Sequence, residues 1–233
     1  MATIYRGSFV PVISYAAYAW TDHLNSVTIR KIIAAHRCAL IRVTKSYRTT
    51  STHALEGLAN MQPVEHELPI EKFRYCLRKS LPCSSYGKVY GTTVQNHKSV
   101  MEQLKADLTT KWNNTWQTST LGRTTYDFFP SVNERKTRIW IVLTYHLSQL
   151  LTGHGDFNKY LADRKIKDSD QCSCGAQDTS IHSIYHCRNF TRQREIFIKK
   201  AITKCYHWPI RSQNLTNKDL FDDFNDFVNN FMT

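Results

Sequence analysis

The sequence predicts a mostly α-helical protein with one small irregular loop that is rich in cysteine and histidine. Apolar residues recur every three or four positions through most of the chain, which is the spacing of one helix face. The breaks between these stretches are short and contain proline, glycine, serine or threonine. With 233 residues, the chain is long enough for one sizeable core, or for two small units and a linker.

The composition favours a polyanionic partner. The chain carries 31 basic and 19 acidic residues, a net charge of +12, and such an excess suits nucleic acid or an anionic membrane surface. No apolar run reaches the length of about twenty residues that spans a bilayer, and the N-terminus lacks the pattern of a signal peptide. The odd cysteine count, seven, predicts thiols in a reducing compartment, nuclear or cytosolic.

The first helix is expected to begin at about Pro11, because proline is tolerated in a first helical turn. Its inward face would carry Ile13, Ala17, Trp20 and Leu24. A second helix, capped by Ser26, is expected over residues 26–48. On a helical wheel its apolar arc covers roughly 100° and contains Ile29, Ile32, Ile33, His36, Leu40 and Val43.

The opposite arc of this second helix is basic and contains no acidic residue. It covers roughly 140° and contains Arg30, Lys31, Arg37, Arg42, Lys45 and Arg48. A charged helix face is usually in contact with solvent only, but such faces normally carry both positive and negative side chains. The single sign of this face therefore predicts contact with nucleic acid.

Two further helices are expected over residues 53–59 and 65–79, separated by Pro63, and the stretch 81–94 is predicted to be a linker. A second helical block, 95–165, begins with a stripe that is typical of a core: Val100, Leu104, Leu108, Trp112 and Trp116. Residues 121–136 are expected to be irregular, and 136–151 helical up to Gly153. His154 is interpreted as part of a turn rather than as a catalytic base. The cations expected to extend the basic surface are Arg123, Arg135, Lys136 and Arg138.

The irregular loop, within residues 166–190, predicts a structural zinc site. Its ligands form the pattern Cys-x-Cys-x7-His-x4-Cys with Cys172, Cys174, His182 and Cys187. Thiolate and imidazole ligands are typical of closed tetrahedral zinc sites, although two residues between the first cysteines are commoner than one. His186 is close enough in sequence to replace His182 as the nitrogen ligand. A zinc hydrolase is disfavoured, because four protein ligands leave no open position.

The tail, residues 191–233, predicts two amphipathic helices. The first is basic, with Phe190, Ile196 and Phe197 on its apolar side, and Trp208-Pro209 ends it. The second runs from Leu220 to Phe231. Its aspartates are explained by solvation and by the helix dipole, since no further group completes a metal site. Around the zinc loop, Ile181, Ile184 and Tyr185 are expected to pack against the metal cluster.

Several stretches, in one order, resemble a known family. They are Ile4-Tyr5 to Pro11, Tyr15-Ala16, Trp20, His36-Arg37, Leu40, Ser46 to Ser51, Ala54-Leu55, Pro63, Trp112, Trp116, Gly122 to Thr124, Phe129-Pro130 and Leu151 to Phe157. This order is similar to the thumb and tail of the Pol polyproteins of non-LTR retrotransposons, above all insect type-1 elements that insert into ribosomal RNA genes. The cysteine-histidine loop lies where those proteins carry a C-terminal zinc knuckle.

The resemblance implies a thumb-like unit over residues 1–80, the linker 81–94, a second unit, the knuckle and the tail. It also implies a longer parent that is an RNA-directed DNA polymerase with endonuclease activity, used in target-primed retrotransposition. The palm and fingers, with their paired aspartates and Mg²⁺, would lie upstream of residue 1, so we expect this chain to be inactive alone. The implied partners are the template–primer, target DNA and the upstream domains, and the implied location is the nucleus after cytoplasmic synthesis. The rival interpretation is a zinc-stabilised protein-interaction module whose basic face is incidental.

Overall fold

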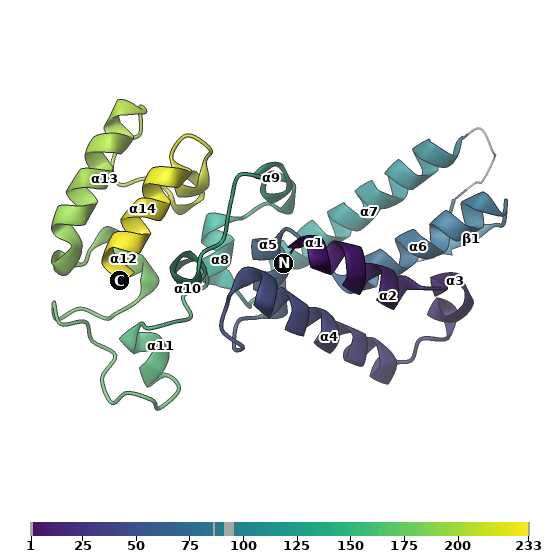
Figure 1. The fold of residues 1–233 in the computed structure, drawn as a ribbon, viewed down its shortest axis with the longest axis horizontal. Helices are drawn as coiled ribbons and strands as arrows, with labels where there is room; N and C mark the ends of the chain where they lie inside the picture. The colour runs from purple at the N-terminus through teal and green to yellow at the C-terminus, as the bar shows by residue number, and fades with distance from the viewer. Residues whose placement is uncertain (1, 86, 91–95, 233) are drawn as a thin grey trace.

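The computed structural model describes residues 2–85, 87–90 and 96–232, and it confirms the mostly helical fold (Figure 1). Helices α1 to α7 and one hairpin form one end of an elongated molecule, and α10 to α14 form the other. Helices α8 and α9 lie between the two ends. Among the described residues, no helix combines the length and the apolar character needed to cross a membrane.

The N-terminal segment is helical from Ala2 and is broken where the sequence predicted one continuous helix. Its pieces are α1 (Ala2–Ile4), a π-helical turn (Tyr5–Phe9), α2 (Val10–Ser14), α3 (Ala17–Trp20) and a 3₁₀ turn (Thr21–His23). The prediction of one helix from Pro11 is therefore wrong. Ala16 has φ 52°, which lies outside the helical region and separates α2 from α3.

Helix α4 (Ser26–Thr44) is the basic helix, and it is shorter than predicted. Its cap is Asn25 rather than Ser26, since the Asn25 side chain accepts from the backbone N–H groups of Val27 and Thr28 at 3.0 and 2.8 Å. The helix ends before Arg48 because Lys45 adopts φ 57°. The helices that follow are α5 (Thr52–Ala59) and α6 (Val64–Arg78).

The expected linker contains a hairpin that packs against its neighbours. Strand β1 (Cys83–Ser85) pairs antiparallel with β2 (Lys88–Tyr90). Tyr90 is buried, with its ring edge-on to Phe73 at 4.9 Å, and its hydroxyl donates to Asp107. Residues 86 and 91–94 of the expected linker lie outside the described residues. The hairpin closes a core between α6 and α7, which contains Ile70, Phe73, Cys76, Leu77, Tyr90, Val100, Leu104 and Leu108.

Helix α7 (His97–Thr118) confirms the predicted apolar stripe, because all five of its stripe residues are buried. The Trp116 indole N–H donates to the Phe129 carbonyl at 2.7 Å. Gly122 lies beside this ring with φ 72°, and a Cβ there would come within 2.9 Å of the Ala54 side chain. Only glycine fits both that conformation and that contact.

The middle of the chain differs from the prediction. The stretch expected to be irregular forms α8 (Arg123–Phe128) and α9 (Val132–Thr137). Residues 138–144 are not helical, and α10 (Tyr145–Thr152) begins only where Thr144 caps it by accepting from the Leu147 N–H at 3.2 Å. Ile139 and Val142 are consequently exposed. Gly153 ends α10 with φ 68°, as predicted.

Two arginines expected on the surface are instead buried. Arg135 donates to the carbonyls of Arg138 and Leu58, and Arg138 donates to that of Gln213. Burial lowers the pKa of Arg135 to about 10. Arg123 and Lys136 are half-buried, with Lys136 donating to Thr109. These four cations join segments of the fold and do not extend the basic surface.

The helices at the C-terminal end of the molecule pack around one large hydrophobic core. Its helices are α11 (Asn158–Ala162), α12 (Ser180–Tyr185), α13 (Thr191–Thr203) and α14 (Phe221–Met232), with 3₁₀ turns at Arg188–Phe190 and Ser212–Thr216. Phe224 and Phe227 of α14 pack on Phe197 of α13, whereas Ile196 is 53% exposed, contrary to prediction. The Asp223 carboxylate lies 2.9 Å from Lys200 and 2.5 Å from Lys204, so it is paired rather than only solvated.

Candidate metal centre and basic surface

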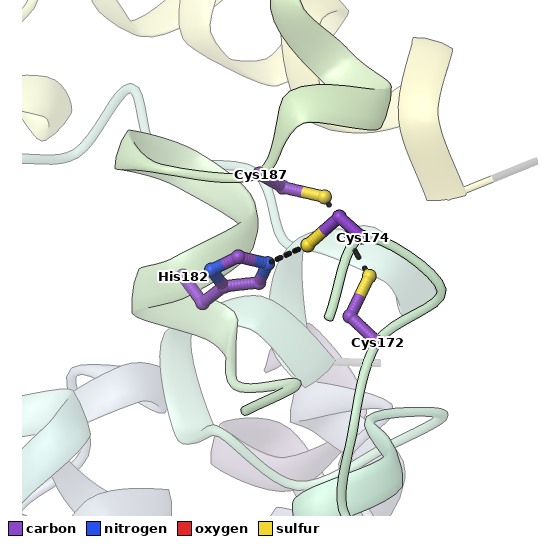
Figure 2. A group of neighbouring side chains, drawn as sticks. All are labelled: Cys172, Cys174, His182 and Cys187. Atoms are coloured by element: carbon purple, nitrogen blue, oxygen red, sulfur yellow. Dashed lines mark hydrogen bonds between the residues drawn. The ribbon is translucent and has the colours of Figure 1, made fainter. Parts of the chain in front are cut away.

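The structure brings the four predicted metal ligands together (Figure 2). The Sγ atoms of Cys172, Cys174 and Cys187 and a ring nitrogen of His182 all lie within 4.8 Å of one another. The Sγ atoms of Cys172 and Cys187 are 3.6 Å apart, and Cys174 Sγ is 3.2 Å from His182 Nε2. Around a tetrahedral ion with metal–sulfur bonds of about 2.3 Å, two sulfurs are about 3.8 Å apart. The cluster therefore fits and could hold a metal ion.

The first two ligands are held by a tight turn. The Cys172 N–H donates to the Ala176 carbonyl at 2.7 Å, and the Gly175 N–H donates to the Cys172 carbonyl at 2.9 Å. Gly175 has φ 92°, which a residue with a Cβ rarely adopts, so the sequence position of this glycine is explained by the turn. The Asn189 side chain donates to Ser173 at 2.8 Å and holds the turn against the second half of the loop.

The other two ligands come from α12 and its C-terminal end. Thr179 caps α12 by accepting from the His182 N–H at 3.1 Å, which fixes the helix start beside the cysteines. The His182 carbonyl in turn accepts from the Cys187 N–H at 2.8 Å. His186 is exposed and is not part of the cluster. The structure thus favours His182 over His186 as the nitrogen ligand.

The protonation of the ligands suits a metal. Burial lowers the pKa of His182, so its imidazole is neutral near pH 7 and its lone pair is available. A hydrogen bond from the Ala176 backbone lowers the pKa of the Cys174 thiol, which favours the thiolate. Burial raises the pKa of Cys187, so a bound cation would stabilise its thiolate by offsetting the buried negative charge.

The metal loop is not an isolated unit. Ile184 is fully buried in the large C-terminal core, and Ile181 and Tyr185 pack against the same core. The loop therefore has a larger core to pack against, which the predicted packing on the metal cluster did not include. The Asn158 N–H at the start of α11 donates to the Asp178 carboxylate at 2.8 Å, which fixes the loop to α11. The loop is thus stabilised by apolar packing against the rest of the fold.

Arg194 is a supporting residue that the sequence interpretation missed. From α13 it donates to three carbonyls around the end of α12, those of Ser183, Ile184 and Cys187, at 3.2, 2.7 and 2.8 Å. The sequence placed it in a basic helix, yet it lies one turn before the buried Phe197. That position on the apolar face was the available signal of burial.

Replacement of Arg194 by alanine is expected to lower the free energy of unfolding by about 3 kcal/mol, since it leaves three buried carbonyls without a charged donor. Urea unfolding followed by circular dichroism measures the change. Arg192→Ala provides the matched control, because Arg192 lies exposed on the same helix. Equal losses in the two variants would contradict the supporting role.

The structure separates the six predicted nucleic-acid contacts into two groups. Arg30, Lys31, Arg42, Lys45 and Arg48 are exposed, and we call these five residues the α4 basic surface. Arg37 is half-buried and donates to the Arg48 carbonyl and, at 3.1 Å, to the Thr52 hydroxyl. Arg37 therefore holds the turn between α4 and α5. The apolar arc faces inward as predicted, with His36 and Leu40 fully buried.

The turn after α4 also contacts the C-terminal half. Tyr47 lies within hydrogen-bonding distance of Tyr145, and Thr49 of Tyr160. His154 Nδ1 lies 3.3 Å from the Thr49 hydroxyl, and burial lowers the His154 pKa to about 4. His154 is thus a neutral residue of a turn, as predicted, and it joins the two halves of the fold.

Known proteins match over most of the chain. The Retrovirus-related Pol polyprotein from type-1 retrotransposable element R1 4 of Nasonia vitripennis is 32% identical over 200 residues, covering 85% of this chain and 51% of that protein. The polyprotein from element R1 2 of the same species is 29% identical over 212 residues, covering 87% of this chain and 50% of its own length. The polyprotein from element R1 of Bradysia coprophila is 26% identical over 201 residues, covering 83% of this chain and 20% of its own length.

The chain is homologous to the Pol polyproteins of insect type-1 retrotransposable elements. This confirms the family resemblance found in the sequence. The chain spans about half the length, or less, of these Pol polyproteins. No protein-family model and no solved structure matches it.

Proposed function

We propose that this chain is a C-terminal, nucleic-acid-binding part of a retrotransposon Pol polyprotein. The α4 basic surface is the observation that carries the proposal. Five cations are exposed on and just after α4, and residues 26–48 contain no acid. Because packing of His36 and Leu40 fixes the inner face, the cations are held outward together. Such a surface binds phosphates and gives affinity for nucleic acid without sequence specificity.

The metal loop supports this function as a structural zinc knuckle. Zinc fits three thiolates and one imidazole, and four protein ligands close its coordination shell. The exposed side chains of Arg188 and Arg192 follow the last ligand, Cys187, in sequence. These two cations can contact a phosphate backbone beside the knuckle. Its role is to hold this end of the chain in one shape, and chemistry at the metal is not required.

The parent polyprotein would supply the catalysis. Homology to Pol polyproteins supports an RNA-directed DNA polymerase with an endonuclease, both outside this chain, and RNA and DNA as the partners. A polymerase palm would bring its own Mg²⁺ and paired aspartates. We propose that the protein acts in the nucleus, where target DNA is found, after synthesis in the cytoplasm.

A salt titration of the purified chain tests the proposal. If each cation of the α4 basic surface contacts one phosphate, the slope of log affinity against log salt is about −4.5, and a fourfold rise in salt weakens duplex binding about 500-fold. Fluorescence anisotropy with two unrelated duplexes measures both affinity and slope. A flat slope would favour the rival, a protein-interaction module with an incidental basic face.

A further inference from the structure

A second surface, at the N-terminal end of the molecule, combines aromatic and basic side chains. It is an open groove of about 670 Å³ between the α2–α3 segment and α6. Its chemically distinctive lining residues are Arg6, Tyr15, Tyr18, Arg74, Tyr75 and Arg78. We call it the tyrosine groove. None of these residues belongs to the α4 basic surface or to the metal centre.

Tyr15 projects from the protein because the backbone turns beside it. Tyr15 is 81% exposed, which is unusual for a residue with so large an aromatic group. The adjoining Ala16 has φ 52°, a conformation that is unfavourable for a residue with a Cβ. The Trp20 indole N–H holds the turn by donating to the Tyr15 carbonyl at 2.8 Å. Unfavourable backbone conformations that are held in this way often serve binding sites.

Tyr18 and Tyr75 form a second exposed aromatic surface in the groove. Their rings stack with centroids 4.5 Å apart and planes 25° apart. Both remain more than a third exposed, at 39% and 37%. Because one residue comes from α3 and the other from α6, the stack is held by two elements and is preorganised for a flat ligand.

The charges of the groove suit a polyanion with aromatic groups. Arg6 and Arg78 are exposed. Arg74 pairs with Glu71. The remaining acid of the groove is Glu67, so its three arginines exceed its two glutamates by one charge. Cations beside exposed aromatic rings are the pattern of surfaces that track a phosphate backbone while its bases stack.

We propose that the tyrosine groove binds a single strand of RNA or DNA. Unpaired bases stack on Tyr15 and on the Tyr18–Tyr75 pair, and the phosphates contact Arg6 and Arg78. A duplex keeps its base faces inside its own stack, so the groove selects single strands. The inference deepens the proposed nucleic-acid function and rests on it, while its residues are separate from those of α4.

The test compares binding of a twelve-nucleotide oligo(dT), an oligo(U) of the same length and a duplex to the full chain by fluorescence anisotropy. Tyr15→Ala is expected to weaken binding of both single strands about tenfold, because one stacking contact is lost, and to leave duplex binding unchanged. Tyr15→Phe should retain single-strand affinity, since the ring remains. Val12→Ala is the matched control, because Val12 is an exposed neighbour on α2.

Photocrosslinking locates the strand independently of affinity. An oligonucleotide with 5-iodouracil is expected to crosslink to Tyr15, Tyr18 or Tyr75, as identified by mass spectrometry. Crosslinks outside the groove, together with unchanged single-strand affinity in Tyr15→Ala, would overturn the inference and leave the groove to a protein partner. Loss of duplex binding in α4 variants bears only on the α4 basic surface, so failures of the two proposals are distinguishable.

Discussion

Replacement of Cys174 by serine is expected to abolish stoichiometric zinc binding and to unfold the C-terminal end of the molecule. Structural zinc contributes about 10 to 16 kcal/mol in isolated finger peptides near neutral pH. A whole domain is typically stable by only about 5 to 15 kcal/mol. The metal loop places Ile184 in the same core as the phenylalanines of α14. Loss of the ion therefore removes support from that whole core.

Metal analysis and limited proteolysis measure this result. The wild-type chain is expected to carry one zinc ion, and Cys174→Ser none. Cleavage should appear first in residues 158–232, while the core between α6 and α7 stays protected, since it contains no residue of the loop. His182→Ala should lose the metal as well, and His186→Ala should keep it, because His186 lies outside the cluster. Full retention of zinc by Cys174→Ser would refute the proposed centre.

Removal of three exposed cations from α4 is expected to weaken nucleic-acid binding strongly. The variant is Arg30→Ala, Lys31→Ala and Arg42→Ala. Each lost phosphate contact makes the salt slope shallower by about 0.9, so three reduce it by about 2.7. Over a fourfold rise in salt, the affinity of the wild-type chain is therefore expected to fall by a factor about 40 times larger than that of the variant. Two unrelated duplexes should be affected alike, because phosphate contacts carry no sequence information.

A charge-matched variant separates local contact from net charge. Lys98 and Lys105 on α7, and Lys218 before α14, are exposed and belong to other elements than α4, so their joint replacement by alanine removes the same charge elsewhere. It is expected to lower affinity only slightly. Arg37 is excluded from the test set because it donates to Arg48 and Thr52, and its loss would disturb the fold. Equal losses of affinity in the two triple variants would show that nucleic-acid binding depends only on the net charge of the protein.

The sequence alone determined the features that depend on local spacing. The stripe from Val100 to Trp116 repeats every four residues, so it can face only one side of a helix, and all of it is buried. The four metal ligands lie within sixteen residues, and so short a loop brings them together with few alternatives. The outer face of α4 followed from its apolar arc for the same reason. The likeness to Pol polyproteins of type-1 retrotransposable elements followed from the order of motifs along the chain.

The tertiary structure decided which cations are exposed and which segments share a core. Arg37, Arg135, Arg138 and Arg194 each donate to carbonyls or hydroxyls of other segments, and no local pattern marks such partners. The exposure of Tyr15 depends on the turn at Ala16 and on the hydrogen bond from Trp20. Helical periodicity fixes the face that a residue shares with its neighbours in sequence. Long-range packing fixes whether that face meets solvent, a partner helix or an unpaired carbonyl.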